Sequence, residues 1–484
     1  MSTATRELEP KAVWNYFTDL NAVPRPSKKE ERVIEFMMEF GRNLGLPTTR
    51  DEIGNVLIKK PATPGKEDRP TIAIQSHLDM VHQKNSSTKF DFLSEGIRMI
   101  VEGDWVKAEG TTLGADNGIG VACAMAVLAS DSLEHPALEA LFTIDEETGM
   151  TGAKGLKGGL LSARYLLNLD TEEDNELCIG CAGGVDVVAT GTYDTEPLPE
   201  GYQLVELALT GLTGGHSGMD IHRGRANANK LMNRLLEVAA RDLGARLVKI
   251  DGGGLRNAIP RESHATLAVA SERMEGLRAL EESLQNTMAN EYATTDPSLA
   301  LAVTPSGTAS GEAASPKATL QFVRAIHSVP NAIYRLSPDV EGLVQTSSNL
   351  ARVIFENGSY QVACLVRGSV DSEKSDMARA IACAMEQIGA EVQTSGDYPG
   401  WAPKPESDVV KVMSRIYRDL FDEEPHVLAC HAGLECGIIG KNYPEMDMIS
   451  FGPNIRGAHS PDEKVQVTSV QKTWRLLTET LAKI

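Results

Sequence analysis

The chain has 484 residues, 42% of them hydrophobic and 24% charged, a balance typical of soluble globular proteins and not of disordered ones. This length exceeds the reach of one ordinary hydrophobic core and indicates roughly three domains or sub-domains. The 47 Lys and Arg residues against 67 Asp and Glu residues give a net charge of −20, which would repel nucleic acid and anionic membranes, so we expect neither as a partner.

The chain begins without the features of a targeting segment. Met1–Pro10 lacks the basic-then-apolar order of a signal peptide. No apolar run in the sequence approaches the ~20 residues that a membrane span needs. We therefore expect a cytoplasmic protein.

The first third of the chain alternates helical patterns with short apolar runs. Residues from about Ala12 to Leu46 are predicted to form helices around a break at Pro24-Arg-Pro26. The remaining predictions are strands at Val56–Lys59, Thr71–Ile74, Leu138–Ile144 and Tyr165–Leu169, and a small-residue helix at Gly118–Ala129. Buried strands that alternate with helices predict an α/β domain with a mainly parallel sheet, whose chemistry gathers beyond the strand C-termini.

The pattern changes near Gly183-Gly184. The alternating polarity of Tyr202–Leu209 is typical of a half-exposed strand. The elements expected next are the helix Ala226–Leu243, the strands Arg246–Ile250 and His264–Ala270, and the helix Met274–Tyr292. A second set follows: the strands Leu350–Phe355 and Tyr360–Arg367, the helix Asp376–Ile388 and the strand Glu391–Gln393. This weak repeat predicts an inserted α+β domain of two lobes.

After Pro399-Gly-Trp401 the α/β pattern returns. The predicted elements are the helix Asp408–Leu420, the strand Met446–Phe451 and a C-terminal helix that reaches Ile484. We therefore expect residues 1–184 and 399–484 to form one domain, interrupted by an insert of residues 185–398.

The seven cysteines are scattered along the chain. Cys178 and Cys181 form a CxxC, but no second pair lies at the spacing of a zinc ribbon. Buried free thiols in a reducing cytosol are favoured over a redox or structural zinc role.

The segment Gln75-Ser-His77-Leu-Asp79 directly follows a predicted strand. Two residues apart on a strand, His77 and Asp79 share one face. One ring nitrogen of the histidine can bind a metal while the carboxylate holds the other. A surface histidine beside a turn aspartate is the alternative that this short motif leaves open.

Asp116 lies in Thr112-Leu-Gly-Ala-Asp-Asn-Gly at the start of the small-residue helix. Each oxygen of a carboxylate at that junction could take one cation. Asp is also among the preferred helix N-caps, and the stretch taken alone favours that interpretation.

Acidic residues follow two of the predicted strands. Asp145-Glu146-Glu147 comes after Leu138–Ile144, and Asp170 comes after Tyr165–Leu169. Adjacent acids beside a buried strand repel one another unless a cation neutralises them, which makes a solvated acidic turn the weaker alternative. One glutamate could bind a metal while its neighbour takes a proton from water.

Two further histidines lie in glycine-containing segments. His459 is on a loop after the predicted strand Met446–Phe451. His216, in Gly214-Gly-His-Ser-Gly218 within the insert, could donate to an oxyanion or could be a turn histidine without a role. His77, His459 and at least four carboxylates lie at strand ends, and such a set suits zinc or manganese in a hydrolytic site. The absence of thiolates argues against structural zinc.

Together these motifs resemble the di-zinc aminopeptidase, carboxypeptidase and deacylase clan, and within it the aminoacyl-histidine dipeptidases, also called Xaa-His or cytosol non-specific dipeptidases. The resemblance runs essentially end to end. Further family-like strings are Lys107–Asp116, Gly180–Gly184, Leu255–Arg261, His431-Ala-Gly-Leu-Glu-Cys-Gly437 and Tyr443–Asp447. Residues around Ala309–Pro316 match no motif of the family.

The resemblance implies a metal centre of two divalent cations, Zn²⁺ foremost, with Mn²⁺ or Co²⁺ as substitutes. The implied ligands are His77 and Asp170 for one ion, Glu147 and His459 for the other, and Asp116 as the bridge. It also implies that Glu146 is the general base and later the proton donor, and that Asp79 orients His77. His216, Asn257 and Arg367 would contact the substrate.

The resemblance further implies a di-zinc exopeptidase-like catalytic domain whose two-lobed insert is a lid, through which many relatives form homodimers. The expected activity is hydrolysis of dipeptides of broad specificity, Xaa-His included, through a hydroxide between two metal ions. The alternatives are an N-acyl amino-acid deacylase or tripeptide aminopeptidase of the same chemistry and, from another class, a non-catalytic metal-dependent binding protein. Against the last, neither Glu146 nor any expected ligand is missing.

Overall fold

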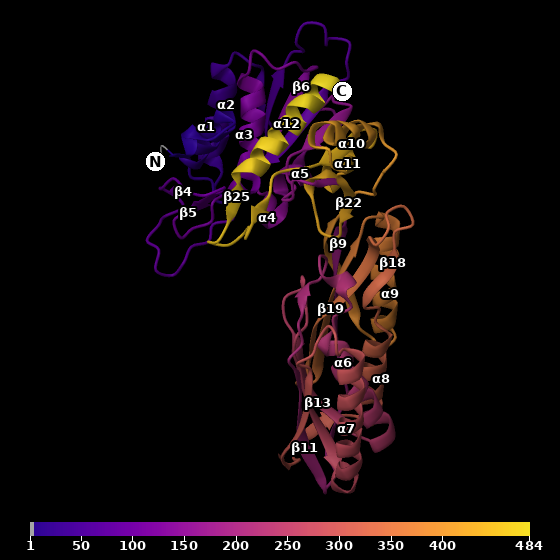
Figure 1. Cartoon of the computed structure of the whole chain (residues 1–484). Coiled ribbons are helices and arrows are strands. Elements are labelled where there is room, and N and C mark those ends of the chain that lie inside the picture. Colours follow the sequence, from indigo (N-terminus) through magenta and orange to yellow (C-terminus); the bar gives the residue numbers. More distant parts are fainter. Residues whose placement is uncertain (1–3) are drawn as a thin grey trace. The chain divides into compact units, whose positions relative to one another are not determined.

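The computed structural model describes residues 4–484, which divide into two compact units with separate hydrophobic cores (Figure 1). Unit 1 contains the described residues up to Gly180, Trp401–Ala429 and Leu434–Ile484. Unit 2 contains Cys181–Gly400 and Cys430–Gly433. The insert predicted from the sequence, residues 185–398, is slightly shorter at both ends than the main segment of unit 2 and does not include Cys430–Gly433. The backbone N–H of Ala182 donates to the carbonyls of Cys430 and Ala432 at 3.2 and 2.9 Å, which holds that short segment against unit 2.

The central sheet of unit 1 is parallel at its centre. Among the described residues it runs in the order β1-β2-β6-β3-β7-β23-β8-β22. The strands are β1 (Thr48–Arg50), β2 (Val56–Lys60), β3 (Ile72–His77), β6 (Leu138–Thr143), β7 (Tyr165–Asn168), β8 (Glu176–Cys181), β22 (His426–Cys430) and β23 (Asp447–Ser450). β6, β3, β7 and β23 pair in parallel, whereas β2 joins β6 and β8 joins β23 antiparallel. The expected mainly parallel sheet is confirmed.

The strands at the centre of this sheet are apolar because helices cover them. Every residue of β3 and β6 is buried. The helices packed around the sheet in Figure 1 are α1 (Lys11–Asn21), α2 (Glu31–Asn43), α3 (Ala115–Ala129), α10 (Asp408–Phe421) and α12 (Val467–Lys483). The small side chains of α3 allow nearly all of that helix to be buried in a large hydrophobic cluster of unit 1.

Several short elements of unit 1 were not predicted. They are α4 (Glu146–Gly149), α5 (Thr151–Gly155), α11 (Glu435–Asn442), and a small sheet in the order β24-β25-β5-β4 of Ile455–Arg456, Lys464–Gln466, Trp105–Ala108 and Met99–Glu102. β24 and β25 pair antiparallel, so the segment between them, which carries His459, is a hairpin loop. Cys178 and Cys181 of the CxxC are buried in β8.

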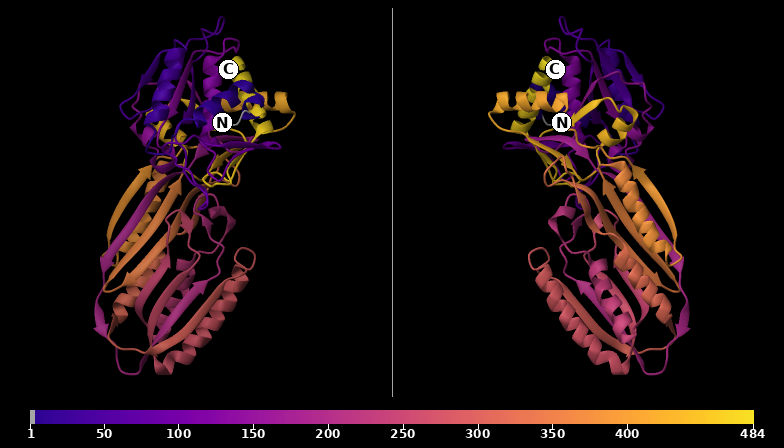
Figure 2. Two further views of the ribbon diagram at one scale, coloured as in Figure 1. Left: turned by 90° about the vertical axis from the view of Figure 1, so that its left-hand side faces the viewer. Right: turned by 90° about the vertical axis from the view of Figure 1, so that its right-hand side faces the viewer.

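Unit 2 contains one continuous sheet with its helices on one face (Figures 1 and 2). Its order in the described chain is β16-β11-β15-β13-β19-β20-β9-β21, with β18 beside β19. The strands are β9 (Gly183–Thr192), β11 (Tyr202–Thr210), β13 (Arg246–Gly253), β15 (Ser263–Ala270), β16 (Ala300–Thr308), β18 (Ala332–Leu336), β19 (Val344–Glu356), β20 (Ser359–Gly368) and β21 (Glu391–Tyr398). The helices are α6 (Ala228–Leu243), α7 (Met274–Glu291), α8 (Pro316–Ser328) and α9 (Asp371–Glu386).

The two α+β halves expected from the sequence are joined through their sheets. β13 of the first half pairs antiparallel with β19 of the second, from Ile250 opposite Phe355 to Gly253 opposite Arg352. One hydrophobic cluster extends beneath both halves.

Helix α8 was not predicted, although two local signals mark its start. Ser315 accepts from the backbone N–H of Ala318 at 3.1 Å as an N-cap, and Pro316 occupies the first helical position. The residues before it, which match no family motif, include the short strand β17 (Glu312–Ala314), which pairs with β10 (Thr195–Pro197). Among residues 4–484, no helix combines the length and apolar character that a bilayer span requires.

Candidate metal centre

Three neighbouring strands of unit 1 end beside one another at the edge where the predicted site residues lie. β3 ends at His77, directly opposite Thr143, the last residue of β6. β7 ends at Asn168, two residues before Asp170, and pairs in parallel with β3. Because parallel strands bring their C-termini to one edge, residues far apart in the chain meet there.

Asp116 lies between the two histidines. Its Oδ1 is 3.1 Å from Nε2 of His77 and its Oδ2 is 3.2 Å from Nε2 of His459. Both of its side-chain oxygens thus face histidines, and among the described residues no backbone N–H of α3 donates to either of them. The N-cap interpretation of Asp116 is therefore wrong, and so is that of a surface histidine, because His77 is only 1% exposed.

The candidate ligands form two groups that share Asp116. In each group one side-chain oxygen or nitrogen per residue lies within 4.8 Å of the others. The groups are His77, Asp116 and Asp170, and Asp116, Glu147 and His459. Nε2 of His77 is 3.5 Å from Oδ1 of Asp170, and Nε2 of His459 is 3.0 Å from Oε2 of Glu147. The structure thus brings together all five residues that the resemblance implied as ligands.

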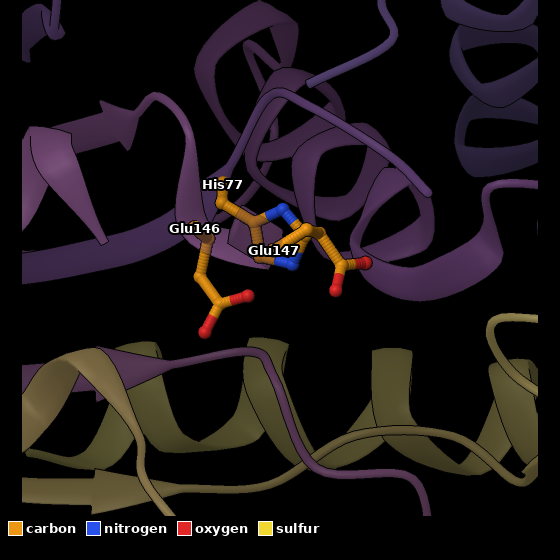
Figure 3. Close-up of side chains that lie close together, drawn as sticks. All are labelled: His77, Glu146 and Glu147. Carbon is orange, nitrogen blue, oxygen red and sulfur yellow. The ribbon is translucent and has the colours of Figure 1, made fainter. Parts of the chain in front are cut away.

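Glu146 lies beside these groups as the first residue of α4, which follows β6. Its carboxylate and that of Glu147 lie to either side of the His77 imidazole, within 4.8 Å of it (Figure 3). The preceding Asp145 stabilises the local turn instead, because its carboxylate accepts hydrogen bonds from the hydroxyls of Thr148 and Thr151. The three consecutive acids therefore divide into one that holds the turn and two that face the site.

The electrostatics of the site favour positive charge. Burial opposes protonation of His77, but Asp170, Asp116 and Asp79 around it raise the pKa of that imidazole well above its usual value. Hydrogen bonds to Asp116 and Glu147 raise the pKa of His459 to about 11. A cation could replace the protons on both histidines, because either a proton or a cation neutralises the negative charge of the surrounding carboxylates.

The carboxyl groups show the same surplus of negative charge. Burial raises the pKa of Asp170 to about 6, with Asp116 and Glu147 adding to the effect. Burial, followed by repulsion from Asp170, Glu435 and Glu147, raises the pKa of Glu146 well above its usual range. Such shifts are typical of sites that bind cations or transfer protons.

Two buried charged residues beside the site were not predicted. Arg25, from the break between α1 and α2, donates to the carbonyls of Leu78 and Asp79 at 3.1 Å and of Gly114 at 2.6 Å. Glu435 accepts from Gln75 and Thr143, both at 2.6 Å. Arg25 lies in the predicted helix break Pro24-Arg-Pro26, and Glu435 lies in the family-like string His431–Gly437. No local pattern indicates that either side chain is buried.

In unit 2, His216 and Arg367 come together. Nη2 of Arg367 is 3.5 Å from Nε2 of His216, and Arg367 is only 5% exposed. Nδ1 of His216 accepts from the backbone N–H groups of Gly218 and Met219 at 3.2 and 3.0 Å. Burial and the charge of Arg367 lower the pKa of His216, which favours the neutral imidazole. Because Nδ1 accepts, the proton of the neutral ring belongs on Nε2.

The loop of Asn257 lies against that of His216. The carbonyl of Asn257 accepts from the backbone N–H of Ser217 at 2.8 Å, and β12 (Gly215–His216) pairs with β14 (Ala258–Ile259). The side chain of Asn257 is exposed. The three residues proposed to contact a substrate thus share one region of unit 2.

Comparison with known proteins agrees with this architecture. The cytosol non-specific dipeptidase of Escherichia coli K12 is 43% identical over 479 residues, which cover 99% of this chain and 98% of that protein. The crystal structure of the aminoacylhistidine dipeptidase of Vibrio alginolyticus superposes with a TM-score of 0.95 at 41% identity, covering 99% and 98% of the two chains.

More distant structures share the fold alone. The aminopeptidase PepT of Bacillus cereus has a TM-score of 0.57 at 16% identity over 98% of both chains. Residues 73–483 match peptidase family M20/M25/M40. The resemblance inferred from the motifs and the expected fold are both confirmed, and the chain belongs to peptidase family M20/M25/M40.

Proposed function

We propose that this protein is a metal-dependent dipeptidase that hydrolyses the peptide bond of dipeptides with broad specificity, Xaa-His included. The names of its relatives in Escherichia coli and Vibrio alginolyticus support the dipeptidase activity. The structural observation that carries the proposal is the position of Asp116, whose two oxygens face two separate ligand groups. A carboxylate placed in this way is suited to bridge two cations.

The residues of unit 1 fit a pair of divalent cations. Two imidazoles and three carboxylates are donors typical of zinc or manganese in hydrolytic sites. Oε1 of Glu147 is buried and finds no hydrogen-bond partner among residues 4–484, which leaves it available to a cation. His77 and Asp170 would hold one ion and Glu147 and His459 the other, with Zn²⁺ expected and Mn²⁺ or Co²⁺ as substitutes. When bound, the ions would lower the pKa of a water and attract the negative charge of the tetrahedral oxyanion.

Glu146 is the proposed proton carrier. It is the carboxylate beside the ligands that belongs to neither of the two groups around Asp116. In the proposed reaction it takes a proton from the attacking water and later gives that proton to the leaving amine. Asp79 keeps it in place by accepting the hydrogen bond of its backbone N–H.

His216, Asn257 and Arg367 are proposed to contact the substrate. The Nε2–H of His216 and Nη2 of Arg367 are both donors and face each other. Two donors so close together favour an acceptor between them, such as a carboxylate or an oxyanion. His216 is therefore proposed as the donor to the oxyanion, with Arg367 and Asn257 as further substrate contacts.

The location and the assembly of this protein are likewise proposals. The relative in Escherichia coli is named a cytosol enzyme, which supports the proposal of a cytoplasmic location. A homodimer formed through the inserted domain, acting there as a lid, remains a proposal.

A substrate-library assay tests the proposed function. The purified protein is loaded with Zn²⁺, its metal content is measured, and hydrolysis is followed on dipeptides, tripeptides and N-acyl amino acids. The proposal expects the dipeptides to be the preferred class and two metal ions per chain. Preference for tripeptides or N-acyl amino acids would identify one of the alternative hydrolases, and bound metal without turnover of any class would indicate a binding protein.

A further inference from the structure

A single buried carboxylate accepts four consecutive backbone N–H groups next to the candidate metal centre. Oε2 of Glu463 accepts from Leu113 and Gly114 at 2.7 and 2.9 Å. Its Oε1 accepts from Ala115 at 2.7 Å and from Asp116 at 3.3 Å. Glu463 is only 2% exposed, and a carboxylate is stable at such a place only where donors surround it.

The same residue is built into the loop that carries His459. The hairpin between β24 and β25 spans Gly457 to Glu463, with β25 beginning at the next residue. Within it Ser460 N–H donates to Gly457 O at 3.2 Å and Glu463 N–H donates to Ser460 O at 3.1 Å. Glu463, 350 residues beyond Leu113 in the chain, therefore joins the backbone before Asp116 to the backbone around His459.

Arg25 holds the Asp116 loop from the other side. Its Nη2 donates to the carbonyl of Gly114 at 2.6 Å, while Glu463 takes the N–H of the same residue. Gly114 has φ +70, and a Cβ there would lie 2.5 Å from that Nη2. The loop thus follows a path that only glycine allows, between two buried side chains of opposite charge.

A helix cap would explain part of this arrangement. The first N–H groups of α3 lack intrahelical partners, and Glu463 satisfies those of Ala115 and Asp116 where Gly114 provides no side-chain cap. A cap, however, needs only to satisfy donors near a helix start. Glu463 also belongs to the His459 hairpin, and His459 and Asp116 are in direct contact at 3.2 Å.

We propose that Glu463 is a positioning residue, which fixes Asp116 relative to His459 and so sets the affinity for the cation shared by Asp116, Glu147 and His459. The inference rests on the proposed metal-dependent function. Its physical basis is preorganisation: ligands on two loops bind a cation more tightly when a buried contact already holds the loops together.

The variant Glu463→Gln tests this role. The amide keeps the volume of the side chain but points an NH₂ group at two of the four N–H donors. The matched control is Asp462→Asn, which removes the same charge from the adjacent, exposed residue of the hairpin. Zn²⁺ affinity is measured on metal-free protein by competition with a chelator, and backbone hydrogen exchange is followed at residues 113–116.

For Glu463→Gln we expect about 10- to 100-fold weaker binding of one of two Zn²⁺ equivalents, the range seen when residues that orient ligands are replaced. Exchange at residues 113–116 should accelerate while β3 stays protected, and excess Zn²⁺ should restore kcat. Asp462→Asn should match the wild type in all three measurements.

Unchanged Zn²⁺ affinity in a folded Glu463→Gln protein would overturn the proposal. If that variant does not fold, the shorter Glu463→Asp is measured instead, and loss of the fold in both would make Glu463 a residue of the core and not of the site. A wild-type protein that binds fewer than two Zn²⁺ ions, or hydrolyses no dipeptide, would instead count against the proposed function.

Discussion

Asp79 connects His77 to Glu146. One oxygen of Asp79 lies 3.4 Å from Nδ1 of His77 and accepts the backbone N–H of Glu146 at 3.0 Å. The other oxygen accepts from the N–H of Glu147 at 3.3 Å and from the hydroxyl of Ser27 at 2.8 Å. A proposed metal ligand and the proposed proton carrier are thus set by one fully buried carboxylate.

Asp79→Asn should weaken both functions. The amide nitrogen would replace one oxygen and lose the hydrogen bonds that this oxygen accepts, so the ring of His77 or the turn of Glu146 would lose its support. We expect Zn²⁺ affinity to fall about 10- to 100-fold, with a lower kcat at saturating Zn²⁺. Chelator competition and steady-state kinetics measure the two effects, with the exposed Asp68→Asn as control. Wild-type values for both would exclude an orienting role for Asp79.

Glu146→Gln should separate metal binding from turnover. The amide has the size of the carboxylate but cannot take up a proton from water. Metal content should therefore stay at the wild-type level, while kcat falls by about 10²–10⁴-fold, the usual contribution of a general acid–base group. Metal analysis and kcat are determined on the same preparation. Near-normal turnover in the metal-loaded variant would contradict the proton-carrier assignment.

Removal of metal should abolish activity reversibly. Ligand sets of histidine and carboxylate accept several divalent ions, so Zn²⁺, Mn²⁺ or Co²⁺ should each restore activity after chelation. Full activity should need two equivalents per chain. If one equivalent gives full activity reproducibly, Asp116 does not bridge two ions.

His216→Ala should lower kcat more than it lowers metal content or stability. The Nε2–H of His216 would act mainly on the charge that develops in the transition state, and loss of such a donor costs on the order of 10²–10³-fold in rate. Metal content should be unaffected, since the proposed ligands all belong to unit 1. We would measure kcat, KM, metal content and Tm together. An effect confined to Tm would show His216 to be a turn residue.

His431 should make the stability of the protein sensitive to acid. Burial, with repulsion from Arg367, lowers the pKa of this histidine to about 3, from about 6.5 in an unfolded chain. The unfolded state therefore binds the extra proton between these values, and the stability that the neutral imidazole contributes is present above pH 6.5 and is lost as the pH falls toward 3.

The test is His431→Gln, whose Tm should change less between pH 7 and pH 5 than that of the wild type, even if it is lower at pH 7. His327→Gln, on the exposed side of α8, is the matched control and should retain the wild-type pH dependence. Parallel pH profiles for the wild type and His431→Gln would show that this histidine does not carry the effect.

The sequence by itself determined the alternation of elements and the kinds of side chain at the strand ends. The apolar runs before His77 and before Asp145 are local patterns, because burial on both faces of a strand imposes them within a few residues, and the acids that follow Ile144 are visible in the same short window. The Ser315-Pro316 start of α8 is also a local pattern, and it could have been predicted from its capping residues alone.

The tertiary structure decided which of these side chains meet. Taken alone, the stretch around Asp116 favours a helix cap, and only the approach of His77 and His459 to its two oxygens shows otherwise. Glu463, 350 residues beyond Leu113, accepts the backbone N–H groups of residues 113–116, which lead up to and include Asp116. No local window contains both partners of a contact between distant loops, so the motifs and the family resemblance could indicate the candidate ligands of this site but not the buried charged residues beside them.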